Sequence, residues 1–305
     1  MRFRNLKWRW IVLLLVVGVV CLFVFGSNRF LYLSHHRFPY TPQWTHQSTA
    51  TNSKPIVVGH RGSGLPSTDS DATSKSRLIG NTREAIDNAI RANVDWIEID
   101  IRKTRDNELV VFHDQRLDEK TNIEGTVKSK DLKELQTCDV STDPKGKILS
   151  LKDVLGTANE FQAKKRNWIL DIKAAGIAGD VISLLESSGI DQDQIIIFGN
   201  HDVLRSYQDK GYRLGYTTLF GKHSHMFFSM DDVYGRCESL SCDLLVVPTI
   251  FVTPTLVSSA KERRIDVWTY DSNDPRDLKY CMECGVQGVI VDTPAETMSQ
   301  FITSD

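Results

Sequence analysis

The sequence has little of several features that mark particular classes of protein. Its 37 lysines and arginines nearly balance its 39 aspartates and glutamates, so the formal net charge is only −2 at pH 7. A nucleic-acid-binding protein usually carries a strongly basic face, and this composition argues against such a partner. The chain also lacks a glycine-rich dinucleotide fingerprint and a Walker P-loop, which argues against a nucleotide-binding open sheet.

The apolar run Trp10–Phe25 has 16 uncharged residues, slightly fewer than the roughly 20 that span a bilayer as a helix. It follows a start that contains only basic charges, which predicts that this end stays in the cytoplasm. A cleaved signal peptide and an uncleaved signal anchor both fit, but Val24-Phe25-Gly26 is a poor cleavage site. We therefore predict that residues 1–33 form a single-pass membrane anchor, with the remaining chain on the non-cytoplasmic side.

Residues 34–54 are rich in Ser, Thr, His, Gln and Pro and lack hydrophobic periodicity, which predicts a linker. The later cysteines do not occur in the glycine-rich context of a zinc ribbon. Disulfides in an oxidising compartment and simple packing both remain open for the pairs Cys237/Cys242 and Cys281/Cys284.

From Ile56 onward, short apolar runs alternate with stretches of helical periodicity. Helices are expected at 82–92, 177–188, 201–209, 255–263 and 274–284. Strands are expected at 56–59, 96–101, 109–113, 168–173, 194–198, 213–219, 244–247, 265–270 and 288–291. Near-continuous apolar strands separated by helices indicate a parallel sheet that is covered on both faces.

A (β/α)8 TIM barrel and a doubly wound open sheet both satisfy this order of elements. The 246 residues of Ile56–Phe301 match the about 250 that a barrel typically needs. Polar residues also stand at the ends of many strands, and a barrel gathers all those ends around one mouth. They are His60, Asp100, His113, Lys173, Asn200, Asp271 and Asp292. We predict a barrel over residues 55–305.

Glu98 and Asp100 are two positions apart on an apolar strand, so both side chains point to one face. Two buried carboxylates on one face repel each other unless a cation lies between them. Asp171 and Lys173 repeat this spacing on a later strand, either as an ion pair or as a third metal ligand beside a phosphate contact. Three oxygen ligands suit a hard cation such as Mg²⁺ or Ca²⁺.

His60 and His113 each end an expected strand close to these acids. Breaking a phosphodiester requires a base for the nucleophile, an acid for the leaving alkoxide, and positive charge at the nonbridging oxygens. Two histidines, three carboxylates, Arg61 and Lys173 supply all these groups. The residues therefore predict a metal-dependent phosphodiesterase site.

Together these motifs make the chain, from about residue 56 to its end, similar to the glycerophosphodiester phosphodiesterase family. The matching stretches are Val58-Gly59-His60-Arg61-Gly62, Asn81-Thr82, Trp96-Ile97-Glu98-Ile99-Asp100, Thr104-Arg105-Asp106, Leu109-Val110-Val111-Phe112-His113-Asp114, Leu117, Leu170-Asp171-Ile172-Lys173, Val267-Trp268-Thr269 and Gly285–Pro294.

The resemblance implies a TIM-barrel enzyme that hydrolyses glycerophosphodiesters to an alcohol and sn-glycerol 3-phosphate. It implies that His60 and His113 are the general acid and base, and that a divalent metal binds the acids. It further implies that Arg61 and Lys173 contact the phosphate and that Trp268 contacts the substrate. The expected ligands of the metal are Glu98, Asp100 and Asp171.

The chain departs from the family pattern at three places. Gly80 stands where the family usually has a glutamate, the loop Ser63–Leu78 is longer than usual, and Asp171 replaces a glutamate. The first two changes bear on the substrate more than on the phosphoryl chemistry. A phospholipase of C or D type that acts on membrane phospholipids or lysophospholipids is thus an alternative. A catalytically inactive barrel with a binding role is a more remote one.

Overall fold

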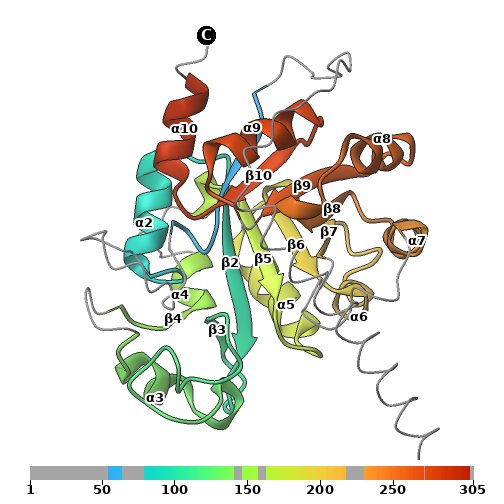
Figure 1. Cartoon of the computed structure of the whole chain (residues 1–305). Coiled ribbons are helices and arrows are strands. Elements are labelled where there is room, and N and C mark those ends of the chain that lie inside the picture. The colour runs from blue at the N-terminus through green and yellow to red at the C-terminus, as the bar shows by residue number, and fades with distance from the viewer. Residues whose placement is uncertain are drawn as a thin grey trace, which may run out of the picture. The chain divides into compact units, whose positions relative to one another are not determined.

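Figure 1 shows the computed structural model of the chain, which describes residues 54–63, 79–140, 146–156, 163–217, 230–270 and 272–302. All of them belong to one compact unit, Ser48–Asp305. The predicted membrane anchor and nearly all of the predicted linker lie outside the described residues, so both stay predictions. None of the helices within the described ranges is long and apolar enough to cross a membrane.

Eight parallel strands close into a barrel in chain order. They are β1 (Ile56–Gly59), β2 (Trp96–Lys103), β5 (Trp168–Ile172), β6 (Ile195–Gly199), β7 (Arg213–Thr217), β8 (Leu244–Pro248), β9 (Asp266–Tyr270) and β10 (Gly288–Val291). β1 pairs with β10 on one side and with β2 on the other, so these eight strands leave no free edge. The predicted TIM barrel is confirmed, and the open-sheet alternative is wrong.

The helices that follow the strands lie on the outside of the barrel (Figure 1). The α-helices are α2 (Arg83–Ala92), α3 (Leu132–Thr137), α4 (Leu151–Leu155), α5 (Ala178–Ser188), α6 (His201–Leu204), α7 (Met230–Ser239), α8 (Pro254–Glu262), α9 (Pro275–Glu283) and α10 (Pro294–Ile302). The short 3-10 turns are η1 (Val127–Ser129), η2 (Ala163–Lys165), η3 (Gln192–Gln194) and η4 (Thr249–Phe251). α6 ends earlier than the predicted 201–209, and α3, α4, α7 and α10 were not predicted.

The two faces of β2 pack in different environments. Ile97, Ile99 and Ile101 face outward into the large core beneath the helices. Trp96 packs inside the barrel with apolar side chains from the other strands. The alternation places Glu98 and Asp100 on the same inner face as Trp96, as the strand period predicts.

β2 is longer than the other barrel strands, and it continues into a small insertion. There β3 (Leu109–Val111) pairs with β2 in the antiparallel direction, and β4 (Leu149–Ser150) pairs with β3. β2 and β3 therefore form a hairpin, and the expectation that 109–113 is one of the parallel strands of the barrel is wrong. β3 returns to the mouth from the far end of β2. The insertion has its own apolar core, formed by Val110, Phe112, Leu117, Val127, Leu135, Cys138, Val140 and Ile148.

The five described cysteines are buried free thiols. Cys237, Cys242, Cys281 and Cys284 belong to the core beneath the helices. The structure therefore agrees with packing as the role of both cysteine pairs.

Candidate active site at the barrel mouth

Three carboxylates converge at the mouth of the barrel, as the sequence predicts. Glu98 and Asp100 come from β2, and Asp171 lies beside Asp100 on the neighbouring strand β5. One carboxylate oxygen of each lies within 4.8 Å of the other two. The side chains of Glu98 and Asp100 are almost fully buried, with residue exposures of 3% and 1%.

Burial and mutual repulsion shape the charge of this acid triplet, formed by Glu98, Asp100 and Asp171. Burial raises the pKa of Glu98 well above its usual value, and the charges of Asp100 and Asp171 raise it further. Burial would also raise the pKa of Asp100, but the cations of Lys173 and Arg61 outweigh it and lower that pKa. At Glu98 the same two cations lower the pKa too little to offset burial and the neighbouring carboxylates. Three oxygen donors in this state fit a hard divalent cation.

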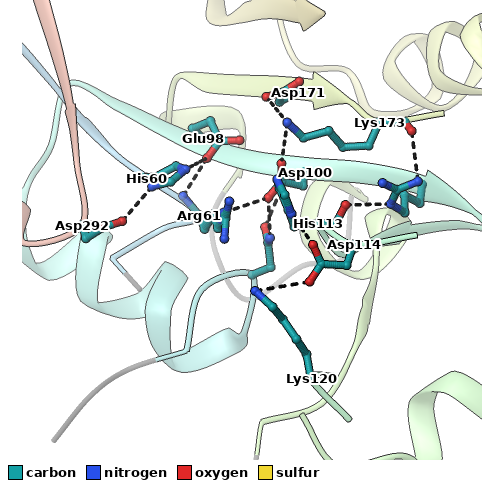
Figure 2. A network of polar contacts seen from close by, with 12 residues as sticks. His60, Arg61, Glu98, Asp100, His113, Asp114, Lys120, Asp171, Lys173 and Asp292 are labelled. Atoms are coloured by element: carbon teal, nitrogen blue, oxygen red, sulfur yellow. Dashed lines mark hydrogen bonds and ion pairs between the residues drawn. The ribbon is translucent and has the colours of Figure 1, made fainter. Parts of the chain in front are cut away.

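Two cationic side chains border the acid triplet (Figure 2). Lys173 Nζ lies 2.6 Å from Asp171 Oδ2 and 3.3 Å from Asp100 Oδ1. Arg61 Nε lies 3.2 Å from Asp100 Oδ2. Burial opposes the charge of Lys173, but Asp171 and Asp100 raise its pKa, so the ammonium stays protonated. Both predicted phosphate contacts are therefore cations at the mouth.

The turn after β1 carries His60 and Arg61, and it depends on Gly62. Arg61 and Gly62 have positive φ angles of 52° and 85°. A Cβ at Gly62 would lie 2.7 Å from main-chain atoms of Ala85 and Ile86. In this conformation the Arg61 N–H donates to Glu98 Oε2 over 2.7 Å, and the Gly62 N–H donates to the Glu98 carbonyl over 2.9 Å. The turn thereby joins His60 and Arg61 to Glu98.

His60 is held by the carboxylate of Asp292, which directly follows the last barrel strand, β10. Its Nδ1 lies 2.7 Å from Asp292 Oδ1, and its Nε2 lies 4.0 Å from Glu98 Oε2. Asn273 Nδ2 donates to the second Asp292 oxygen over 3.1 Å. Burial opposes the charge of Asp292, but hydrogen bonds from His60 and Asn273 lower its pKa. An ionised Asp292 accepts a hydrogen bond from the Nδ1–H, and Nε2 is directed toward the acids.

His113 is held in a similar way by its neighbour in the sequence. Its Nδ1 lies 2.6 Å from Asp114 Oδ1, and Lys120 Nζ lies 3.2 Å from Asp114 Oδ2. The hydrogen bond from His113 is the main reason why the pKa of Asp114 falls to about 2. Both predicted histidines thus have a carboxylate partner at Nδ1.

Asn81 holds Asp100 through two hydrogen bonds. Its Nδ2 donates to Asp100 Oδ2 over 2.7 Å, and its Oδ1 accepts from the Asp100 main-chain N–H over 3.1 Å. The next residue, Thr82, caps the N-terminus of α2 by accepting a hydrogen bond from the Ala85 N–H. The left-handed φ of 66° at Asn81 directs its side chain at the acid instead.

Trp268 lies inside the barrel, whereas a residue that contacts the substrate is expected to reach the mouth. It is fully buried in the barrel interior, with ring centroids 6.5 Å from Trp96 and 6.3 Å from Phe198. Its space exists because Gly288 has no side chain, since a Cβ there would lie 2.7 Å from the indole. The indole Nε1 has no hydrogen-bond partner within the described ranges. Its predicted role in substrate binding is not visible here and stays a prediction.

Sequence reasoning assigned no role to four partners of the site: Asn81, Asp114, Lys120 and Asp292. Asp292 was noted only as a polar strand end, and Asp114 and Asn81 only as parts of matching stretches. Lys120 carried no signal, because it reaches Asp114 from a turn of the insertion. The complete arrangement contains two histidine–carboxylate pairs, three acids and two cations, which are the groups needed for acid–base chemistry on a phosphodiester.

Comparison with known proteins agrees with this chemistry. Residues 60–296 match the Glycerophosphoryl diester phosphodiesterase family. A glycerophosphodiester phosphodiesterase of Caldanaerobacter subterraneus subsp. tengcongensis is 26% identical over 261 residues, covering 82% of this chain and 98% of that protein.

Solved structures share the fold. A phosphodiesterase of Oleispira antarctica, solved with the product sn-glycerol-3-phosphate, has a TM-score of 0.65 and 22% identity, covering 82% of this chain and 97% of that one. A glycerophosphodiester phosphodiesterase of Thermotoga maritima has a TM-score of 0.62 and 24% identity, covering 82% of this chain and 100% of that one. The chain therefore belongs to the glycerophosphoryl diester phosphodiesterase family and is a phosphodiester hydrolase.

Proposed function

We propose that the chain is a metal-dependent glycerophosphodiester phosphodiesterase, which hydrolyses its substrate to an alcohol and sn-glycerol 3-phosphate. The observation that carries this proposal is the arrangement of His60 and His113 around the acid triplet, each with a carboxylate at Nδ1. The Oleispira antarctica relative, whose structure contains sn-glycerol-3-phosphate, supports the product.

In the proposed reaction the two histidines transfer the protons. One imidazole removes the proton of the attacking hydroxyl, and the other donates a proton to the leaving alkoxide. If a glycerol hydroxyl attacks first, the product is a cyclic phosphate, which water then opens with the same two groups. Lys173 and Arg61 stabilise the negative charge on the nonbridging oxygens.

Glu98, Asp100 and Asp171 would hold a divalent cation, for which Mg²⁺ and Ca²⁺ are the candidates. When bound, the cation supplies positive charge for the phosphoryl oxygens. It would also relieve the repulsion among the acids, which adds to burial in raising the pKa of Glu98. Asn81 would keep Asp100 oriented for binding.

We further propose that residues 1–33 anchor the enzyme in a membrane, with the barrel on the non-cytoplasmic side. The basic residues before Trp10–Phe25 support this orientation. Fusion of an alkaline phosphatase reporter after residue 54 tests it, because this reporter is active only outside the cytoplasm. An inactive, protease-protected reporter would contradict the proposed orientation.

A product assay tests the substrate. Residues 48–305, which cover the compact unit, should release sn-glycerol 3-phosphate from glycerophosphocholine in the presence of a divalent cation. Diacylglycerol, phosphatidate or cyclic phosphate from intact lipids, without turnover of glycerophosphocholine, would instead identify a phospholipase. Gly80 stands where the family usually has a glutamate, and it directly precedes Asn81 at the mouth. The product assay therefore has to compare glycerophosphocholine with intact lipids.

A further inference from the structure

Arg102 has no part in the proposed chemistry, yet it occupies a position next to it. It follows Asp100 by two positions on β2, so the strand period directs both side chains to one face. The side chain of Arg102 is partly buried. The C-terminal part of β2, which carries Arg102, is flanked by β3 on one side and by β5 on the other.

The guanidinium of Arg102 joins two residues of the proposed site through their main chains. Its Nε donates to the His113 carbonyl over 2.8 Å, and its Nη1 donates to the Lys173 carbonyl over 3.0 Å. His113 follows β3, and Lys173 follows β5. One side chain thus bridges the strand ends that carry a predicted proton-transfer group and a predicted phosphate contact.

The two hydrogen bonds of Arg102 lie just beyond the last main-chain hydrogen bonds that join β2 to its neighbours. The Phe112 N–H donates to the Asp100 carbonyl, and the Lys173 N–H donates to the Ile101 carbonyl, both over 3.0 Å. Beyond these bonds, the carbonyls of His113 and Lys173 accept from Arg102 instead. The planar guanidinium offers donors in fixed directions, whereas a lysine ammonium is a single point of charge on a flexible stem. An arginine is therefore suited to this position and a lysine is not.

We propose that Arg102 is a positioning residue that fixes His113 and Lys173 relative to each other across β2. The inference rests on the proposed function, in which His113 transfers a proton and Lys173 contacts the phosphate. Arg102 does not touch the reacting atoms of the proposed mechanism. It acts through the main chain of two residues that do.

The kinetic test compares Arg102→Met and Arg102→Lys with Arg105→Met, a matched loss of an arginine from the connection that follows β2. Arg105 is exposed and pairs with Asp131 at the surface. Both Arg102 variants should lower kcat on glycerophosphocholine by about 10- to 100-fold, because small displacements of catalytic groups are costly. Arg105→Met should stay within about twofold of the native enzyme. Full activity of Arg102→Lys would overturn the requirement for the arginine fork.

A double-mutant cycle separates positioning from general destabilisation. In a His113→Ala background, Arg102→Met should lower kcat by a smaller factor than in the native enzyme, because one of the two residues on which Arg102 acts has already lost its side chain. A purely structural role would lower kcat equally in both backgrounds and would overturn the proposal.

Hydrogen exchange tests the bridge independently of any substrate. In Arg102→Met, the amides of residues 112–114 and 173–174 should exchange faster than in the native protein, and in Arg105→Met the amides at 173–174 should not. Unchanged exchange at both segments of Arg102→Met would overturn the bridge. If the native enzyme proves inactive on glycerophosphocholine, the proposed function fails, while the exchange measurement still decides the bridge.

Discussion

Asp292 Oδ1 lies 2.7 Å from His60 Nδ1, although 232 positions separate the two residues in the chain. The contact forms because β1 and β10 are neighbours in the closed barrel, so that the residues after both strands meet at the mouth. An ionised Asp292 favours the tautomer with the proton on Nδ1 and keeps Nε2 directed toward the acids. If Asp292 orients His60 in this way, removing its charge should lower the turnover number.

Replacing Asp292 with Asn should lower kcat by about 10- to 100-fold with little change in KM, because the amide no longer selects one tautomer of His60. Steady-state kinetics on glycerophosphocholine measure both constants. Asp274→Asn is the control, since its carboxylate pairs with Arg276 at the surface. If both variants turn over like the native enzyme, Asp292 does not position His60.

Replacing either His60 or His113 with Ala should lower kcat by about 100-fold or more, because each imidazole carries one of the two proton transfers. The fold should be intact, which circular dichroism and thermal unfolding of each variant can establish. His201→Ala is a matched control, because His201 lies on α6 and contacts Asp202 rather than the acid triplet. Retained activity in His60→Ala would refute the assigned mechanism.

Removal of divalent cations should abolish activity, because the acid triplet needs positive charge between its members. Exhaustive dialysis against EDTA, followed by addition of Mg²⁺ or Ca²⁺, measures loss and recovery and identifies the effective ion. Glu98→Gln should weaken binding of that ion in calorimetry, since it removes one anionic ligand. Activity that survives the chelator would exclude a required exchangeable cation.

Gly62→Ala should destabilise the protein by about 1–3 kcal/mol, because a side chain at positive φ is strained and this one would also meet the main chain of α2. Gly235→Ala provides the contrast. Gly235 lies within α7 with no atom near the place of a Cβ, so alanine there should be neutral or stabilising by about 0.5–1 kcal/mol. Chemical unfolding of both variants measures the difference. Equal stabilities would show that the turn tolerates a side chain.

Site residues were predictable where acidic or histidine side chains occur at the spacing of a strand, or at its end, within one short segment. Glu98 and Asp100 share a face because they are two positions apart, and the histidines mark the ends of apolar runs. Asp292 and Lys120 could not be assigned a partner in this way. Their contacts depend on barrel closure and on the path of the insertion, which no local pattern encodes.

By itself, the sequence determined the barrel strands, the fold class, the family and the residues that we propose to carry the phosphodiester chemistry. These follow from local periodicity and from side-chain types in fixed spacings. Only the tertiary structure decided that His113 returns on an antiparallel strand, that Trp268 is buried in the barrel, and that Arg102 bridges two strand ends. The physical reason is that hydrogen bonds and packing between distant segments depend on how the chain closes on itself.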